Sequence, residues 1–284
     1  MSHPRAVLIT GCSSGIGRAL ALECAARGHR VYAGARRPET LAGLSAHGIT
    51  AVELDVTSPE ARSAALARMQ AEAGGVDVLV NNAGFGAIAP LLDLPAQAWR
   101  EQLETNLLAP LELVRLAVPA MVERGGGRVV NIGSVAGLFV TPFAGAYCAS
   151  KAALNAASEA LRMELAPLGV EVMLVRAGAV RTRFAANARR RVGQWTGEGS
   201  LYEPVSHRVR ERAGASQGWS QKPETCARRI ADAMLGARMP ALLAVGRGGR
   251  ALPLLARCLP LSLRAAWLVR RFGLADLHST GVTR

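Results

Sequence analysis

The chain is predicted to fold as an α/β protein, in which helices cover both faces of a doubly wound parallel sheet. Two observations lead to this prediction. Short apolar runs without polar alternation recur through the first 175 residues, and stretches with helical character separate them. Strands that are buried on both faces contain such runs, and right-handed crossovers through helices make the sheet doubly wound. The length of 284 residues is ample for one large domain of this kind.

Strands and helices are expected to alternate along the chain. The predicted strands are residues 6–10, 30–33, 50–54, 76–80, 128–132, 170–175 and, at an edge, 241–245. Helices are predicted over residues 15–28, from 59, in two stretches between 95 and 123, around 147–167, and from 222. Ser58 is expected to cap its helix, with Pro59 in the first helical position. Ligands of such sheets bind beyond the carboxyl ends of the strands, so site residues should follow the strands.

A glycine-rich turn follows the first strand directly. Gly11, Gly15 and Gly17 are spaced as GxxxGxG, whereas the standard dinucleotide fingerprint is GxGxxG. Glycines let the backbone turn tightly and approach a pyrophosphate, and the N-terminus of the next helix offers free N–H groups and a partial positive charge. The turn therefore predicts a phosphate cradle, with a plain strand-to-helix turn as the alternative.

The residues after the second strand distinguish the two nicotinamide cofactors. A carboxylate there would bind the adenosine ribose hydroxyls and repel a 2′-phosphate. The chain has no acid at this place and has Arg36 and Arg37 instead. Arg36 can pair with a 2′-phosphate in fork geometry, and Ser13 and Ser14 can donate hydrogen bonds to the same group. NADP(H) is therefore favoured over NAD(H); in the alternative, the two arginines only begin a surface helix.

Polar residues also follow the third and fourth strands. Asp55 stands where a carboxylate can accept a hydrogen bond from the adenine amino group, although it could also cap a turn. Asn81 and Asn82 can tie neighbouring strand ends together, and Gly84 leaves room for the cofactor ribose. An Asn-Gly-type turn is the plain alternative.

A tyrosine and a lysine stand four residues apart in the second half of the chain. The chain has three tyrosines and two lysines, so composition alone explains the pairing of Tyr147 with Lys151 poorly. On a helix these two residues share one face. An ammonium beside a phenol lowers a pKa that is normally about 10, which lets a tyrosine transfer protons near neutral pH. Ser134 precedes Tyr147 by thirteen residues and, taken alone, could be purely structural.

Together, these motifs resemble the short-chain dehydrogenase/reductase family, whose Rossmann-type fold agrees with the predicted sheet. The matching motifs, over residues 5–185, are Thr10-Gly-x-x-x-Gly15-x-Gly17, Asp55, Asn81-Asn82-Ala83-Gly84, Asn106, Ser134 and Tyr147-x-x-x-Lys151. A narrower likeness, to the NADP-linked steroid and retinol dehydrogenase branch, is carried by Cys12-Ser13-Ser14, Val31-Tyr32-Ala33 and Arg36.

The resemblance implies a role for each site residue. Ser134 would hold the substrate oxygen, and Tyr147 would pass the proton. Lys151 would bind the nicotinamide ribose and lower the pKa of the tyrosine, and Asn106 would fix a water that continues a proton relay from Lys151. The predicted cofactor-binding residues are Gly11, Ser13, Ser14, Gly15, Ile16, Gly17, Arg36, Asp55, Val56, Asn82, Ala83, Gly84, Tyr147, Lys151, Val180 and Thr182.

One segment departs from the family pattern. The family usually has Pro-Gly after the sixth strand, whereas this chain has Ala177-Gly178. Without the proline the φ angle is no longer fixed, so we expect a somewhat looser turn but not a lost site. Val180 and Thr182 match the family positions that contact the nicotinamide carboxamide.

The excess of basic residues lies in the last third of the chain. Residues 1–175 hold 14 basic and 15 acidic residues, and residues 176–284 hold 20 and 6, so the net charge of +13 arises there. A nucleic-acid binder would be more uniformly basic, so no nucleic-acid partner is predicted. Solvated arginines, an anionic membrane surface, and an acidic substrate or carrier all stay open as explanations.

Residues 1–245 are predicted to form the catalytic domain, with a substrate loop at 183–222, and residues 246–284 a basic, apolar extension. Arginines recur in the extension at 250, 257, 264 and 271, with leucines and Trp267 between them. Pro253 and Pro260 would break it into short helices. No uncharged apolar run reaches the length of about 18 residues that a membrane span needs. The extension is expected to cover the substrate mouth or a partner subunit, or else to lie in a membrane interface.

The sequence thus predicts an NADP(H)-dependent oxidoreductase that interconverts an apolar secondary alcohol and a ketone, of steroid, retinoid or fatty-acyl type. A 3-oxoacyl-thioester reductase and a non-catalytic NADP(H)-sensing protein are the alternatives.

Five cysteines without CxxC or metal spacing indicate reduced thiols and no metal site. The first apolar run is too short for a signal peptide, so a cytoplasmic protein is expected. Members of the family are often dimers or tetramers, so a homo-oligomer is expected as well.

Overall fold

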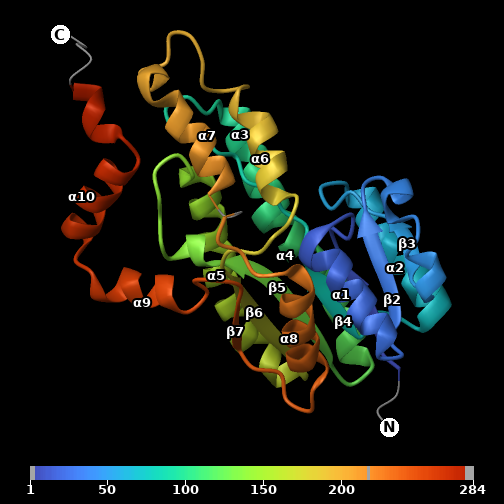
Figure 1. Cartoon of the computed structure of the whole chain (residues 1–284). Helices are drawn as coiled ribbons and strands as arrows, with labels where there is room; N and C mark the ends of the chain where they lie inside the picture. The colour runs from blue at the N-terminus through green and yellow to red at the C-terminus, as the bar shows by residue number, and fades with distance from the viewer. Residues whose placement is uncertain (1–3, 216–217, 279–284) are drawn as a thin grey trace.

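The computed structural model describes residues 4–215 and 218–278, in which seven parallel strands form one sheet (Figure 1). The strand order is β3-β2-β1-β4-β5-β6-β7, and every neighbouring pair is parallel. The strands are β1 (Ala6–Ile9), β2 (Arg30–Ala35), β3 (Thr50–Glu53), β4 (Val78–Asn81), β5 (Gly127–Ser134), β6 (Val170–Ala177) and β7 (Leu242–Val245). The predicted doubly wound α/β fold is therefore confirmed. Parts of the predicted domains, at residues 1–3, 216–217 and 279–284, lie outside the described residues.

The central strands are apolar on both faces, as the sequence indicated. In β1, Val7 and Ile9 pack into one apolar cluster, and Ala6 and Leu8 pack into another on the opposite face. All four side chains are buried. A strand in this position has no solvent-facing side, which is why its sequence shows no polar alternation.

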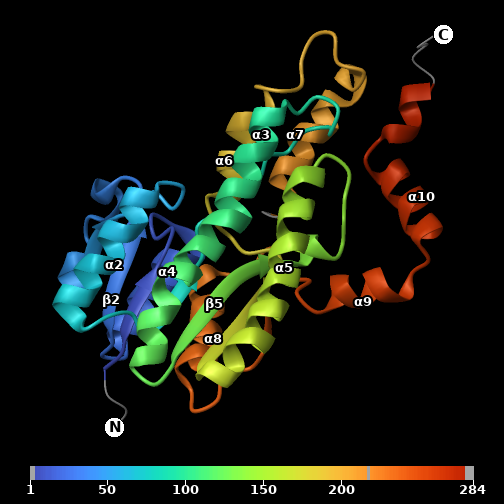
Figure 2. The same ribbon diagram turned by 180° about the vertical axis from the view of Figure 1, so that it is seen from behind.

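Helices cover both faces of the sheet. On the face seen in Figure 1, α1 (Gly15–Ala26) packs against α8 (Pro223–Leu235). On the other face, seen in Figure 2, lie α2 (Pro59–Ala73), α4 (Ala109–Glu123) and α5 (Gly145–Leu165). Helix α2 begins as predicted, because the Ser58 hydroxyl accepts a hydrogen bond from the Ala61 N–H at 3.1 Å.

The two helical stretches predicted between residues 95 and 123 form one continuous helix. Helix α3 (Ala96–Leu103) passes through a π-helical turn (Glu104–Leu108) into α4. The whole is 28 residues long and, by length and composition alone, apolar enough to cross a membrane. Leu113 and Met121 of α4 are nevertheless buried in the apolar cluster on the sheet. The helix is therefore a core helix of the fold.

A smaller lobe stands beyond the carboxyl ends of the strands. Its helices α6 (Phe184–Val192) and α7 (Ser206–Gly214) pack against each other and share an apolar cluster with Phe143 and Cys148. The sequence of this lobe showed no strong periodicity, so its helices were not predicted. Their apolar residues make contact with the loop before α5 and with α5 itself, which are distant in the sequence.

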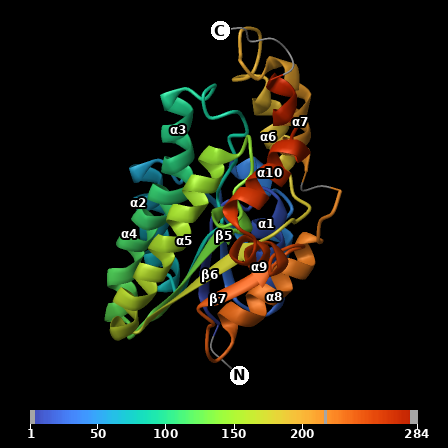
Figure 3. The ribbon, with the colours of Figure 1, turned by 90° about the vertical axis from the view of Figure 1, so that its left-hand side faces the viewer.

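The chain continues into an extension that leaves the main body in Figure 1 and lies in front of it in Figure 3. It consists of α9 (Ala251–Cys258), α10 (Leu261–Arg271) and a 3₁₀ turn (Leu274–His278). Pro260 separates the two helices as predicted. The prediction that Pro253 also breaks the helix is wrong, because Pro253 lies in the first turn of α9, where a backbone N–H has no partner to lose.

Candidate active site

The glycine turn after β1 requires glycine at each of its three positions. Gly11 and Gly15 have φ angles of 72° and 62°, in the left-handed region that favours glycine. A Cβ atom at Gly17 would collide with the Asn82 amide nitrogen and would lie 2.7 Å from the carbonyl oxygen of Gly11. The turn therefore brings the N-terminus of α1 against the end of β4, and its three glycines add no side chains of their own.

Asparagines tie the strand ends together at this edge of the sheet, as predicted. The Asn82 amide donates to the Thr10 carbonyl at 2.8 Å, and the Asn82 N–H donates to the Thr10 hydroxyl at 2.9 Å. The Asn81 amide donates to the Asn131 side-chain oxygen at 2.9 Å, which joins β4 to β5. The bonds of Asn82 fix the ends of β1 and β4, between which the strand order reverses.

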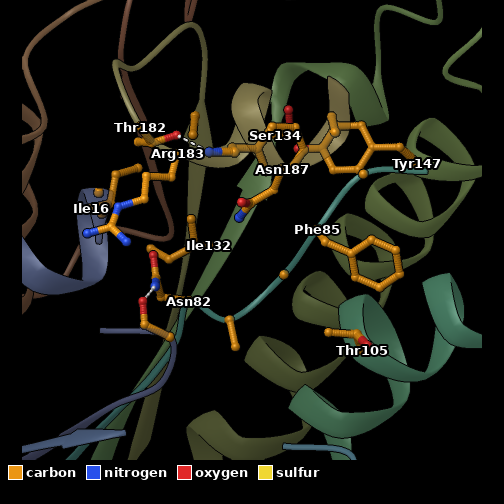
Figure 4. Close-up of a pocket in the computed structure, with 18 of the residues that line it drawn as sticks. Ile16, Asn82, Phe85, Thr105, Ile132, Ser134, Tyr147, Thr182, Arg183 and Asn187 are labelled. Atoms are coloured by element: carbon orange, nitrogen blue, oxygen red, sulfur yellow. Dashed lines mark hydrogen bonds between the residues drawn. The ribbon is translucent and has the colours of Figure 1, made fainter. Parts of the chain in front are cut away.

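A cavity of about 880 Å³ lies over these strand ends. Figure 4 shows Ile16 and Thr182 at one end of the view and Tyr147 at the other, with Ser134 beside it. The predicted site residues that line the cavity are Gly11, Ser13, Ser14, Gly15, Ile16, Arg36, Asp55, Val56, Asn82, Ala83, Gly84, Ser134, Tyr147, Lys151, Val180 and Thr182. Elements from across the first 182 residues therefore meet in one cavity.

Two of the predicted site residues, Gly17 and Asn106, do not line the cavity. Gly17 acts through the close approach of α1 to Asn82. The Asn106 side chain is fully buried in the π-helical turn, where it accepts from the Phe85 N–H at 3.1 Å and donates to the Phe85 carbonyl at 2.9 Å and the Ser150 hydroxyl at 3.0 Å. Asn106 thus anchors the segment after β4, and its role in a proton relay stays a prediction.

Tyr147 and Ser134 both line the cavity and lie side by side in Figure 4. The Tyr147 ring packs on Phe184 of α6, with ring centroids 5.2 Å apart. Burial raises the pKa of the Tyr147 phenol, and the hydrogen bond to Ser134 and the charge of Arg212 oppose this change without cancelling it. At neutral pH the phenol of the unliganded protein is therefore protonated.

Lys151 is buried, and its Nζ donates to the Ile132 carbonyl at 2.8 Å. Burial lowers the pKa of the Lys151 ammonium to about 8. In the chain alone burial raises the pKa of the Tyr147 phenol and lowers that of the Lys151 ammonium, so the role of Lys151 in lowering the pKa of Tyr147 stays a prediction. A Cβ atom at Gly84 would lie 3.7 Å from Nζ, so glycine leaves space beside the amine.

The opposite end of the cavity has the features expected for the adenosine half of a dinucleotide. Arg36 is exposed and lines the cavity, and it forms no ion pair with any described residue, whereas Arg37 pairs with Glu39 at 4.0 Å. Asp55 also lines the cavity, and one of its carboxylate oxygens accepts from the N–H and hydroxyl of Thr57 at 3.0 and 2.8 Å. Asp55 therefore does cap a turn, while remaining at the position predicted to face adenine.

The turn after β6 is not loose, in contrast to the prediction. The Ala179 N–H donates to the Arg247 carbonyl at 2.8 Å, and the Arg181 N–H donates to the Gln221 carbonyl at 2.9 Å. A Cβ atom at Gly178 would collide with the Arg247 carbonyl oxygen. Hydrogen bonds to segments far along the chain therefore provide the order that a proline would have supplied locally.

Several residues that the sequence did not single out also line the cavity. They are Phe85, Ile88, Thr105, Arg183, Phe184, Arg212, Trp219, Arg247 and Leu252, among others. Four of them, Arg183, Phe184, Arg212 and Trp219, belong to α6, α7 and the segments around them, where no motif marks a position. No cluster of three metal-binding side chains occurs within residues 4–215 and 218–278.

The cavity fits a dinucleotide that carries phosphate groups. Its glycine turn adds no side chains of its own at three positions, and no side chain caps the N-terminus of α1, which is a favourable place for a pyrophosphate. Arg36 and Arg183 line the same end of the cavity as the turn (Figure 4 shows Arg183 near Ile16). The donors and the positive charge required for an anionic cofactor are thus present at one end, and Tyr147 is at the other.

Comparisons with known proteins agree with this geometry. The family model for short chain dehydrogenase matches residues 5–193. The uncharacterized oxidoreductase YbbO of Escherichia coli strain K12 is 42% identical over 184 residues, which are 64% of this chain and 68% of that protein. Human 17-beta-hydroxysteroid dehydrogenase type 1 is 40% identical over 190 residues, 63% of this chain and 57% of that protein. A short-chain dehydrogenase from Streptomyces avermitilis superposes with a TM-score of 0.79 at 32% identity, covering 98% of this chain and all of that chain.

Similar structures contain either nicotinamide cofactor. A short-chain dehydrogenase/reductase from Burkholderia phymatum, in complex with NAD, is 27% identical with a TM-score of 0.76 and covers 89% of this chain and 92% of that chain. A metagenomic short-chain oxidoreductase, in complex with NADP, is 28% identical with a TM-score of 0.67 and covers 85% and 96%. The similar structures therefore do not agree on one cofactor.

Proposed function

The chain is an oxidoreductase of the short-chain dehydrogenase family, and we propose that it uses NADP(H) to interconvert an apolar secondary alcohol and the corresponding ketone. The observation that carries this proposal is that the hydroxyl groups of Ser134 and Tyr147 line one cavity together with the buried amine of Lys151. A hydroxyl pair of this kind can hold a carbonyl oxygen and protonate it.

The proton chemistry follows from the state of the phenol. Because burial raises its pKa, Tyr147 holds its proton at neutral pH and can donate it to the oxygen of a ketone. Ser134 donates to the same oxygen and stabilises the charge that develops there. When bound, NADP(H) supplies the hydride for reduction or accepts it for oxidation. Phe184 packs on the tyrosine ring and limits the access of water.

The cofactor preference is proposed from the end of β2. Arg36 is exposed at the cavity and has no acidic partner among the described residues, so its fork of N–H donors suits a 2′-phosphate. Ser13 and Ser14 line the cavity at the same end. An NAD(H)-specific site would instead carry a carboxylate after β2.

The substrate class is proposed from the lining near Tyr147. Ile88 and Phe184 are apolar and pack near Tyr147, and Val135 and Ala136 follow Ser134 along the chain. A relative named as a hydroxysteroid dehydrogenase is 40% identical over its matched region, which supports a bulky, mostly apolar substrate. Removing such surface from water provides binding energy away from the reacting oxygen.

The test is turnover with NADPH and NADH against a panel of steroid ketones, retinal, 3-oxoacyl thioesters and small ketones. We expect NADPH oxidation with bulky apolar ketones, and a kcat/KM at least about 10-fold below that for NADPH when NADH is used, which corresponds to one charge-assisted contact. Preference for NADH would overturn the assignment of Arg36. Turnover of thioesters alone would favour a 3-oxoacyl-thioester reductase, and cofactor binding without any turnover would favour a sensor.

A further inference from the structure

Arg212 is a charged residue at the cavity that the proposed reaction does not use. Val209 and Ala213, its neighbours on α7, are buried in the apolar cluster that contains Phe143. Arg212 itself is mostly covered and lines the cavity. Its Nε donates to the Thr141 hydroxyl at 2.9 Å, and this bond orients one edge of the guanidinium.

No anion compensates this charge within the described part of the chain. No Asp or Glu among the described residues forms an ion pair with Arg212. The groups near enough to feel its charge are Tyr147 and Cys148, and burial raises the pKa of both, so neither is an anion at neutral pH. Burial also lowers the pKa of Arg212. A covered, unpaired cation opposes folding unless a ligand brings the opposite charge.

We propose that Arg212 binds a carboxylate of the substrate, so that the substrate is a ketone or secondary alcohol whose apolar body carries one carboxylate. The proposal rests on the proposed function and narrows its substrate class. A guanidinium held at Nε can present its remaining N–H groups to both oxygens of a carboxylate. Ile88 and Phe184 line the same cavity, which leaves the rest of the substrate apolar.

The position of Arg212 separates it from the phosphate groups of the cofactor. Thr141, to which it is bonded, precedes α5, and Tyr147 is in the first turns of that helix. Ile16, a residue of the glycine turn, and Arg183 lie at the end opposite Tyr147 in Figure 4. An anion bound at Arg212 would therefore be part of the substrate that reaches Tyr147, and not a phosphate group of the cofactor.

The first test compares long-chain oxo-carboxylic acids with their methyl esters as substrates, with NADPH, for the parent, Arg212→Met and Arg210→Met. Arg210 is the matched control, because it is an exposed arginine on the same helix. We expect the parent to prefer the acid, and Arg212→Met to lower kcat/KM for the acid about 100-fold while the ester changes less than about 3-fold. Equal effects on acid and ester, with a shifted pH profile for both, would show that Arg212 only tunes Tyr147 and would overturn the proposal.

A second measurement does not depend on turnover. Calorimetry on NADP⁺-saturated protein compares decanoate with decanol, which lacks the charge. Decanoate should bind to the parent and to Arg210→Met, and its binding should be lost in Arg212→Met. If decanoate does not bind to the parent, the proposal fails even where ketones are reduced. If decanoate binds through Arg212 and no ketone is reduced, the anion site stands and the proposed function fails.

The surface of the C-terminal extension is both apolar and basic. Exposed apolar side chains are concentrated on its two helices, at Leu254, Leu255, Leu261, Leu263, Trp267 and Val269. Arginines accompany them at 250, 257, 264, 270 and 271, and no acidic residue occurs between Asp232 and Asp276. Apolar and positively charged side chains thus share one exposed surface. Within α9 and α10, Leu268 alone is buried.

We infer that α9 and α10 lie on an anionic lipid surface. The arginines complement negative head groups, and leucine and tryptophan side chains can enter the interface. Helices of 8 and 11 residues are too short to cross a bilayer, so they would lie along it. A second copy of the chain would bring the same arginines to the same surface, and like charges would oppose that contact. The Arg264 side chain stacks over Phe139 at 5.6 Å and holds the extension to the body.

Flotation with vesicles tests this inference. The parent should float with vesicles that contain phosphatidylserine, more weakly at high salt, and not with phosphatidylcholine alone. The double variant Leu263→Ser/Trp267→Ser should bind at least about 10-fold more weakly, whereas Met163→Ser, an exposed apolar residue on α5, should bind like the parent. The inference is overturned if the parent does not bind anionic vesicles, or if light scattering shows a dimer that the double variant disrupts.

Discussion

Replacing Lys151 by methionine should stabilise the unliganded protein while removing its proposed activity. The Lys151 side chain is 6% exposed, and burial lowers its pKa from the usual 10.5 to about 8. At about 1.4 kcal/mol for each pH unit, this difference places the cost of burying the charge at about 3 kcal/mol. Methionine is similar in length and carries no charge. Loss of the hydrogen bond to the Ile132 carbonyl would offset about 1 kcal/mol, so the expected gain in unfolding free energy at pH 7 is about 2 kcal/mol.

The pH dependence of this gain has a definite sign. Below about pH 8 the lysine is charged in both states, and the folded protein bears the full cost. Between about pH 8 and the ordinary lysine pKa of 10.5, the unfolded chain retains a proton that the folded protein has released, so the stability of the parent rises with pH. The methionine variant lacks this slope. The advantage of the variant should therefore be largest below pH 8 and should shrink as the pH rises.

The assay is urea unfolding of the apoprotein, followed by tryptophan fluorescence from pH 6.5 to pH 9.5. Lys222→Met is the matched control, because Lys222 is the other lysine of the chain and is exposed. The control should stay within about 0.5 kcal/mol of the parent. A Lys151→Met variant that is less stable than the parent at pH 7, or whose advantage is the same at every pH, would refute this account of the buried amine.

Three further predictions concern the cofactor, the reacting oxygen and the glycine turn. Arg36→Leu should raise the Kd of NADPH about 10- to 100-fold and that of NADH less than about 3-fold, measured by cofactor fluorescence; equal losses would contradict pairing with a 2′-phosphate. Ser134→Ala should lower kcat about 100-fold in steady-state assays, since one donor to the developing oxyanion is lost; an unchanged kcat would remove Ser134 from the reaction. Gly17→Ala should lower the unfolding free energy by about 1–3 kcal/mol, because its Cβ would collide with Asn82; parental stability in urea would mean that the turn can relax.

The sheet could be predicted from the sequence because its strands report their own environment. A strand such as β1, covered on both faces, must be apolar at every position, and this pattern is visible without knowledge of its neighbours. The lobe of α6 and α7 could not be predicted in this way. Its helices are short and rich in arginine, and the cluster that holds Val209 and Ala213 includes Phe143, far away in the chain. Tertiary contacts decide its structure.

The same distinction holds for the candidate site. Residues that follow strands are placed by the topology, so Asn82, Ser134 and the glycine turn could be located from the sequence. The pKa of Tyr147 could not be predicted from the sequence, because it depends on burial beneath Phe184 and on the charge of Arg212. Both residues belong to the lobe that was not predicted. A phenol and an amine at helical spacing indicate chemistry, but their protonation depends on what covers them.

Single-turnover reduction of a ketone by NADPH, compared between the parent and Tyr147→Phe, tests whether Tyr147 transfers the proton. If Tyr147 transfers the proton, the variant should bind NADPH within about 3-fold of the parent, while the rate of NADPH oxidation falls at least about 1,000-fold. A rate within 10-fold of the parent, at equal occupancy by the cofactor, would contradict the role of Tyr147 and with it the proposed reaction.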